Sequence, residues 1–375
     1  MADQLYFSRD TKVYLKQGTN VWALPILQGY SFSQTTNTSE VTLNEMADSS
    51  GNSRRARMAF NDSYSPAEFS FSMYARPFIA DGEAVEGWEA TVDNHHAVEE
   101  ALWANFVAIN SWSGSAWAEG ITNSTSNMVI DFSGSNKTTL GEFELYFELG
   151  GCSATATPTI YKIDKCVLNS VNINFDIDGI ATLEWSGMGA LLTKVVSAPT
   201  ITINEATTVT SNFIRNRLTS LTITASDTTT FPGASNNGIY SAVLTGGSIS
   251  FENNISFLTP ETLCVVNAPI GHVVGSRTIG GNFTCYLNAA GDGSSADFFA
   301  DLQAATTTIT NEFELVFSVG GSLTPRIEIS IPQAHVSIPS IGIEDVISLS
   351  VDFMALPSSL DATDEATITY TGTTY

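Results

Sequence analysis

Alternating hydrophobic and polar positions recur along this chain and predict that most of it is β-strand. In Glu142–Leu149, Val171–Asp178 and Ile347–Phe353, every second side chain is apolar and the intervening ones are acidic, Ser, Asn or Tyr. A period of two places one face of a strand on a core and the other in water, which is typical of antiparallel sheets. The water-facing side of these predicted strands is repeatedly acidic.

Two stretches have helical rather than strand spacing. The first is Asp93–Ile109, with Asp93 as N-cap and an apolar stripe of Val98, Leu102, Trp103, Phe106 and Val107. The second is Ser295–Ala305, capped by Ser294 or Ser295, with Phe298, Phe299 and Leu302 facing inward. In the first helix, His95 and His96 are expected to be exposed polar residues of the first turn.

The chain repeats itself once. Gly141–Phe147 (GEFELYF) has a near copy in Asn311–Phe317 (NEFELVF), and a Gly-Gly pair follows each, at Gly150-Gly151 and Gly320-Gly321. Weaker matches upstream keep the same order, but the first copy is longer by about 44 residues within Phe78–Leu140. Four of the six tryptophans fall in this insertion: Trp88, Trp103, Trp112 and Trp117.

The repeat predicts a mainly β protein of two tandem β-sandwich or barrel domains, each with one flanking α-helix. We expect the first domain at residues 1–194, with the insertion in about 78–140, a linker at 195–213 and the second domain at 214–375.

Net charge and composition exclude several partners. The 375 residues carry a net charge of −24, divided as −12 for residues 1–195 and −12 for residues 196–375. Binding to nucleic acid phosphates over a broad surface, or to an anionic membrane, needs clustered Lys and Arg and is therefore disfavoured. Apolar runs are too short to span a bilayer, and the N-terminus has no secretory signal pattern, so we expect a soluble chain that is not exported by that route.

Residues that carry chemistry are nearly absent. The four histidines do not have metal-site spacing, no nucleophile or phosphate-loop motif occurs, and Cys152, Cys166, Cys264 and Cys285 form no CxxC pair. Reduced buried thiols are expected, with a Cys152–Cys166 disulfide as the alternative. Calcium at the acidic clusters near Asp176 or Asp361 is a minor alternative to solvated turns. We expect no catalytic, cofactor or metal site.

The segment Glu40–Asp62 predicts a long hairpin arm. Its arginines Arg54, Arg55 and Arg57 stand close together in a strongly acidic protein. Long structured loops are usually functional, so we interpret it as a docking arm that pairs with carboxylates of a neighbouring copy; a solvated hairpin is the alternative. The predicted contact residues are Glu40, Glu45, Asp48, Arg54, Arg55, Arg57 and Asp62.

Several strings resemble the siphophage tail tube family, in its double-domain type known from coliphage T-five, over essentially the whole chain. In the first half they are Ser39–Glu45, Phe60–Ser63, Ala67–Ser72 and Leu183–Gly187; in the second they are Gly246-Gly247, Asn253–Ile255, Leu258–Pro260, Pro269–Gly271, Gln333–Val336 and Pro357–Ala362.

The resemblance implies a structural virion protein that polymerises as stacked rings of three chains, pseudo-sixfold in symmetry, around a channel for the phage genome. It implies assembly in the host cytoplasm into the tail, a tape measure protein in the lumen, and tail terminator and distal tail proteins at the ends. DNA would pass without specific binding, past carboxylates for which Glu142, Glu144, Asp176 and Asp178 are candidates. The C-terminal immunoglobulin-like domain of the family's archetype is not expected here.

Two other functions fit the same features. The clustered tryptophans could form the stacking platform of a tandem carbohydrate-binding module. Alternatively, the same fold could serve in a contractile tail or secretion system. An enzyme is the least favoured class, because no catalytic constellation is apparent.

Overall fold

Strands dominate the computed structural model of the chain. It describes residues 6–41, 49–52, 57–80, 88, 93–132, 139–150, 157–203, 211–226, 228–229, 231–235, 237–260, 266–304, 313–343 and 345–374. The first part contains β1 (Lys12–Gln17), β2 (Asn20–Leu24), β3 (Ser31–Ser33), β4 (Thr36–Val41), β5 (Met58–Tyr64), β6 (Ala67–Tyr74), β7 (Pro77–Ile79), β8 (His95–Ala97), α1 (Glu100–Val107), β9 (Ile121–Asn123), β10 (Met128–Asp131), β11 (Phe143–Leu149), β12 (Thr159–Asp176), β13 (Thr182–Gly189) and β14 (Leu192–Val195). The second contains β15 (Ser220–Ala225), β16 (Ile239–Ala242), β17 (Leu244–Glu252), β18 (Ile255–Leu258), β19 (Gly271–Val274), β20 (Thr278–Tyr286), α2 (Ser295–Ala304), β21 (Phe313–Val319), β22 (Arg326–Val336), β23 (Ser340–Gly342), β24 (Ser348–Ala355), β25 (Thr367–Thr371) and β26 (Thr373–Thr374).

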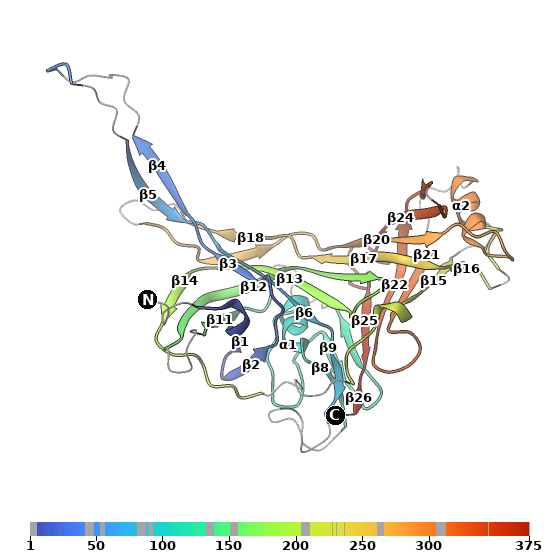
Figure 1. The fold of residues 1–375 in the computed structure, drawn as a ribbon, viewed down its shortest axis with the longest axis horizontal. Coiled ribbons are helices and arrows are strands. Elements are labelled where there is room, and N and C mark those ends of the chain that lie inside the picture. Colours follow the sequence, from blue (N-terminus) through green and yellow to red (C-terminus); the bar gives the residue numbers. More distant parts are fainter. Residues whose placement is uncertain are drawn as a thin grey trace.

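One antiparallel sheet runs through both parts of the chain. Its strand order is β3–β6–β13–β12 in the first part and β17–β20–β24–β22 in the second. The two series join where β12 pairs with β17, from Ser170 opposite Glu252 to Asp176 opposite Gly246. We refer to these eight strands as the joined sheet. Figure 1 shows it curving across the molecule, with α1 beneath it and the β4–β5 hairpin projecting from one end.

A second layer repeats in the same way. The order β2–β1–β11–β12–β14 in the first part corresponds to β16–β15–β21–β22–β25 in the second. The long strands β12 and β22 belong to both layers. The pairing of each shows a register shift near the point where the strand passes from one layer to the other. The strand order therefore follows the sequence repeat, while the domain boundaries drawn from that repeat stay predictions.

Aromatic side chains fill the space between the joined sheet and α1. Trp103 of α1 meets Trp185 of β13 with ring centroids 5.0 Å apart, and Phe251 of β17 at 5.9 Å. All eight residues of α1 are buried, so this short helix is a core element. Because Trp103 touches strands from both parts of the chain, one hydrophobic core spans the joined sheet.

The two helix predictions had different outcomes. The predicted helix at Ser295–Ala305 is confirmed as α2 (Ser295–Ala304). At its start the Asp297 amide donates to Ser294 Oγ and the Ser294 amide donates to Asp297 Oδ2, as in a capping box. The helix predicted at Asp93–Ile109 was too long, because residues 95–97 form strand β8 and α1 begins only at Glu100. His95 and His96 are buried there, which corrects the expectation of an exposed first turn.

The predicted insertion and linker also contact other parts of the chain. Strand β10 pairs with β25, and β7 pairs with β26, so two strands from the insertion border the C-terminal segment. In the predicted linker, Ile203 and Thr202 donate their amides to the Val21 carbonyl; residues 204–210 lie outside the described part.

Two neighbouring carboxylates, Glu99 and Glu100, are buried in the predicted insertion. Glu100 accepts hydrogen bonds from Trp117 Nε1 at 2.7 Å and Asn123 Nδ2 at 3.1 Å, and lies 2.9 Å from His96 Nδ1. Glu99 is equally buried, and its side chain accepts hydrogen bonds from the Arg76 amide at 3.3 Å and from the Tyr370 hydroxyl. Burial raises the pKa of Glu99 from 4.5 to about 7, against the opposing effects of Tyr370 and Arg76.

We predict that Glu99→Gln stabilises the protein at neutral pH. A carboxyl whose folded pKa is raised stabilises the fold below its unfolded pKa of 4.5, and that contribution is lost as the pH rises through about 7. The amide avoids this loss, so the variant should gain on the order of 1–3 kcal/mol over wild type at pH 8 and nearly nothing at pH 4.5. Denaturant titrations at both pH values measure the difference.

Glu100→Gln is the matched control, because it places an amide NH₂ against groups that already donate. That variant should lose stability at both pH values. A Glu99→Gln variant that is no more stable at pH 8 than wild type would contradict the assignment of a buried, poorly compensated carboxyl.

Candidate assembly surfaces

The joined sheet has one apolar and one polar face. Along β12 the buried side chains Val171, Ile173 and Phe175 alternate with Asn172, Asn174 and Asp176. The other central strands continue both faces, because register places Ser72, Glu184, Asn172, Ser250 and Gly280 in one row across the sheet. The polar face therefore runs without interruption from the first part of the chain to the second.

Small polar and acidic side chains make up most of that face, and Tyr286 and Met354 are large side chains exposed on it. The segments 67–74, 167–176, 182–189, 244–252, 278–286 and 348–355 contain no Lys or Arg. Their exposed charged residues are the carboxylates Glu68, Asp176, Glu184, Glu252 and Asp352. In these segments the face presents hydroxyl, amide and carboxylate oxygens, without a Lys or Arg that could bind a polyanion such as DNA.

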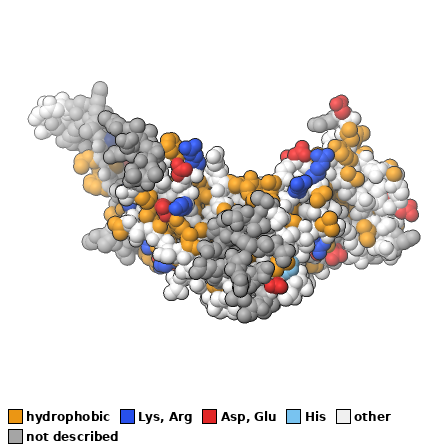
Figure 2. Space-filling model, turned by 60° about the horizontal axis from the view of Figure 1, so that its bottom comes forward, with side chains coloured by type: hydrophobic (Ala, Val, Ile, Leu, Met, Phe, Trp, Pro, Cys, Tyr) orange, Lys and Arg blue, Asp and Glu red, His pale blue; other side chains and the backbone are white. Residues whose placement is uncertain are grey.

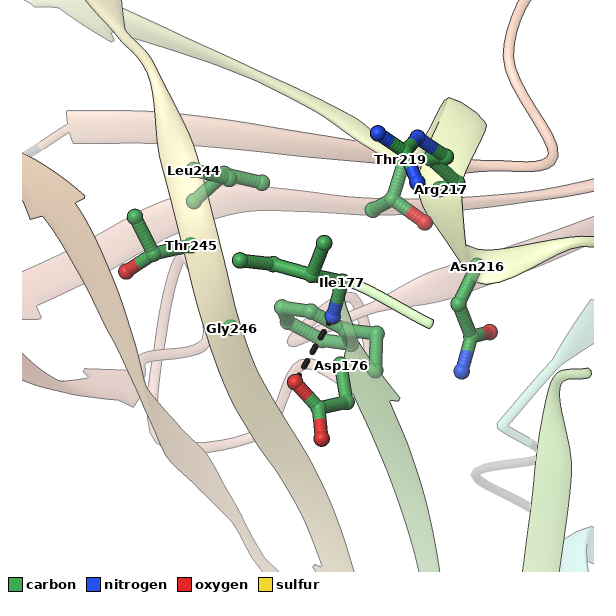
Figure 3. Close-up of a pocket in the computed structure, with 9 residues that line it drawn as sticks. Asp176, Ile177, Asn216, Arg217, Thr219, Leu244, Thr245 and Gly246 are labelled. Carbon is green, nitrogen blue, oxygen red and sulfur yellow. Dashed lines mark hydrogen bonds between the residues drawn. The ribbon is translucent and has the colours of Figure 1, made fainter. Parts of the chain in front are cut away.

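The four candidate lumen carboxylates occupy different places. Asp176 is exposed at the end of β12 on the polar face, and Asp178 lies just beyond it, 3.2 Å from the Arg217 guanidinium. Figure 3 shows the pocket at this end, of about 150 Å³, where Asp176 and Arg217 lie on opposite sides of Ile177 and the Asp176 carboxylate accepts the Ile177 amide. Glu144 belongs to β11, outside the joined sheet.

Glu144 is a paired carboxylate of the second layer. Its oxygens lie 2.8 Å from Lys16 Nζ and 3.4 Å from Lys162 Nζ, and Tyr146 donates its hydroxyl at 2.8 Å. Although partial burial works to raise the pKa of Glu144, these partners hold it below its usual value. Glu142, just before β11, lies 3.3 Å from Nδ1 of the buried His272. Sequence alternation marked both as water-facing without distinguishing the two layers.

The joined sheet ends in an open strand on each side. In the described part of the chain, β3 pairs with β6 and with no strand on its other side. At the opposite border, the end of β22 and β23 both pair with β24. Exposed apolar side chains gather there: Ile338, Ile341, Ile343, Val346 and Ile347 are between 42% and 83% exposed. Open edges and exposed apolar groups are both features of surfaces that pair with another chain.

The hairpin of β4 and β5, which we call the arm, is the other protruding surface. Val41 opposes Met58, and Phe60 lies two residues further along β5; these three side chains are 42%, 61% and 55% exposed. Arg57 pairs with Glu40 across the hairpin at 3.1 Å, and Asp62 accepts a hydrogen bond from Ser39. Of the predicted contact residues, Glu45, Asp48, Arg54 and Arg55 lie outside the described part of the chain. Sequence reasoning missed the apolar residues of the arm.

Other candidate chemistry is not assembled in the described residues. The tryptophans of the insertion, Trp88, Trp103, Trp112 and Trp117, are at most 7% exposed, so they do not form an exposed stacking platform. Cys166 and Cys285 are buried free thiols, and Cys152 and Cys264 fall outside the described part.

No group of three or more His, Cys, Asp or Glu in the described residues could hold a metal ion. No helix there is long and apolar enough to cross a membrane. In the view of Figure 2, charged side chains lie in small separate groups rather than in one patch.

Comparison with known proteins identifies the family. A family model described as "Phage tail tube protein" matches residues 22–355. The chain belongs to the phage tail tube family. It is also 31% identical over 382 aligned residues to "Tail tube protein pb6" of Escherichia phage T5, covering 96% of this chain and 75% of that protein. The resemblance inferred from the sequence strings is thereby confirmed, as is the mainly β fold. Membership of the tail tube family gives the protein a structural role in the phage tail.

Proposed function

We propose that three copies of this protein close into a ring and that stacked rings form the tail tube through which phage DNA passes. The observation that carries the proposal is the junction between β12 and β17. There, the last strand of the first series pairs over seven residues with the first strand of the second series. At the borders of the joined sheet the same two kinds of position are held by β23, which follows β22, and by β3, and neither has a second strand partner in the described part of the chain.

Head-to-tail pairing of these borders would repeat the internal junction between chains. The β22–β23 border of one chain would receive β3 of the next, and the exposed isoleucines beside β23 would become buried. A heterologous contact of this kind closes into a ring when the rotation per copy divides a full turn. With two similar parts per chain, three chains give a ring that looks sixfold.

The polar face of the joined sheet is our proposed channel lining. Carboxylates such as Glu184, Glu252 and Asp176 repel phosphate, while neutral Ser, Asn and Thr give no strong attachment. Such a surface lets DNA slide past. Glu142 and Glu144 lie outside the joined sheet, so the proposal does not include them in the lining.

The arm is proposed to contact an adjacent ring or subunit, through the predicted arginines and the apolar row of Val41, Met58 and Phe60. The other parts of the proposal follow from a role in the tail: a tape measure protein in the lumen during assembly, terminator and distal tail proteins at the tube ends, and assembly in the host cytoplasm. A structural polymer of this kind needs no catalytic centre.

The first prediction from this proposal concerns ring stoichiometry. Isolated rings should have about three times the chain mass of 40.1 kDa when measured by native mass spectrometry. End-on images should look sixfold, because the two parts of each chain are alike. Rings of six chains would contradict this stoichiometry while leaving the tube role in place.

The second prediction concerns the arm. Replacing Arg54, Arg55 and Arg57 with Ser should reduce tube yield without lowering the melting temperature of the subunit by more than a few degrees. Exposed ion pairs such as Arg57–Glu40 contribute only about 0–1 kcal/mol to folding. Arg9→Ser, which removes another exposed arginine beside Asp10, is the control and should polymerise normally. Unchanged tube yield in the triple variant, measured by electron microscopy and sedimentation, would rule out an arginine-dependent arm.

The third prediction concerns the channel lining. Glu184→Lys with Glu252→Lys should leave tubes intact but slow DNA ejection from phage that carry the variant, because phosphate would then meet cations. The slowing should be greater at low salt, since the screening length shortens to ~8 Å near 0.15 M. Glu314→Lys, at an exposed position of β21 outside the joined sheet, is the matched control. Equal ejection rates for the lining and control variants would argue against this lining.

A further inference from the structure

The two hairpins that leave the joined sheet occupy equivalent places but have different surroundings. The arm connects β3 to β6, and the shorter hairpin β18–β19 connects β17 to β20. The two hairpins also touch: the Tyr64 amide donates to the Asn267 carbonyl at 2.7 Å, and the Asn267 amide donates to the Asp62 carbonyl at 3.3 Å. This contact places the base of the arm beside the loop of the shorter hairpin.

The shorter hairpin covers a defined spot on the first part of the chain. Ile255 and Val274, which pair with each other at its base, pack in one cluster with Val167 of β12 and Met188 of β13. Val167 and Met188 are themselves partners across the sheet. Lys165 reinforces the contact by donating to the Ile270 carbonyl at 2.8 Å. At the internal junction, the β18–β19 hairpin therefore packs on β12 and β13 through an apolar cluster and one hydrogen bond.

The equivalent surface in the second part of the chain, at His335 and Met354, is exposed in the single chain. His335 is the structural equivalent of Val167. The residue before it, Ala334, pairs with Phe313, and the residue before Val167, Cys166, pairs with Phe143. His335 pairs with Met354, as Val167 pairs with Met188. In the single chain Met354 is 50% exposed and His335 is also exposed.

We propose that the base of the arm of one chain seats over His335 and Met354 of the next chain in the ring, with Asp62 facing His335. This inference rests on the head-to-tail closure proposed above and names its contact surface. The occupant is a second copy of this chain, because the internal junction places the equivalent hairpin at the equivalent spot.

The chemistry of the two surfaces is complementary. At the internal junction both sides are apolar, with Val274 and Ile255 over Val167. At the junction between chains, the sheet side offers the imidazole of His335 beside Met354, and the base of the arm offers the Asp62 carboxylate and the half-exposed ring of Tyr64. Each side of this contact therefore carries a polar residue, His335 on the sheet and Asp62 on the arm, and the two can pair with each other.

Cysteine cross-linking of the full chain tests the contact. The pair Asp62→Cys with His335→Cys should give disulfide ladders that end at three chains under mild oxidation. A second pair, Tyr64→Cys with Met354→Cys, should do the same if the arm lies one position further along the contact surface. Asp62→Cys with Gln303→Cys, which moves the second thiol to exposed α2, should remain monomeric on non-reducing gels.

Charge exchange gives an independent readout. His335→Glu alone should lower ring yield by about tenfold, because two carboxylates would then face each other. Adding Asp62→Lys should restore most of that yield. Both positions are exposed, so melting temperatures of the monomers should stay near wild type.

The outcomes separate this contact from the ring itself. Rings of three chains with neither cross-link and no effect of His335→Glu would overturn the contact and leave the closure standing. A ladder that ends at six chains would support the contact and overturn the stoichiometry. Absence of rings from the wild-type chain would overturn both.

Discussion

Hydrogen bonding at the border of a β-sheet is the constraint on which the rest of this structure depends. A border strand exposes a row of amides and carbonyls that must bond to something. The chain satisfies one such border internally by pairing β12 with β17 over seven residues. Joining the two series doubles the sheet but, in the described part of the chain, leaves one open strand of each kind at its ends. A monomer would have to protect such borders, whereas a tail tube protein can use them for self-association.

The two faces of the joined sheet divide the remaining tasks. The apolar face is closed by a short, fully buried helix whose Trp103 contacts Trp185 and Phe251 from the two parts of the chain. This shared core fixes the curvature across the junction, because neither part can move without disturbing the other's packing. The opposite face has no such constraint and carries small polar and acidic residues. A well-packed core behind a surface of this kind would suit the channel wall that we propose for DNA.

Residues 78–140, the predicted insertion, add a second connection between the two parts of the chain. Strand β10 extends the layer that contains β25, and the Gly372 amide donates to His95 Nδ1 at 2.8 Å. Trp103 Nε1 donates to the Tyr370 hydroxyl at 2.8 Å, which places the C-terminal strand against α1. Buried carboxylates in this region are costly unless donors surround them, and Glu100 meets that condition far better than Glu99. The insertion therefore fastens the C-terminal segment to the first part of the chain.

The sequence by itself determined the strand content, the internal repeat, the hairpin arm and the family. Period-two alternation is a local property, so β11, β12 and β24 could be read directly, and the capping residues before α2 marked its start. Local pattern failed at His95 and His96, because the stretch before Ala97 is polar and its burial comes from distant partners: Phe78 pairs with His96, and the Gly372 amide donates to His95 Nδ1. The sequence also could not separate Glu144 from Glu184. Both lie on the polar face of an alternating strand, but pairing assigns one to the second layer beside Lys16 and the other to the joined sheet. Strand pairing joins residues far apart in the chain, so only the tertiary structure decided which polar face is continuous and which borders stay open.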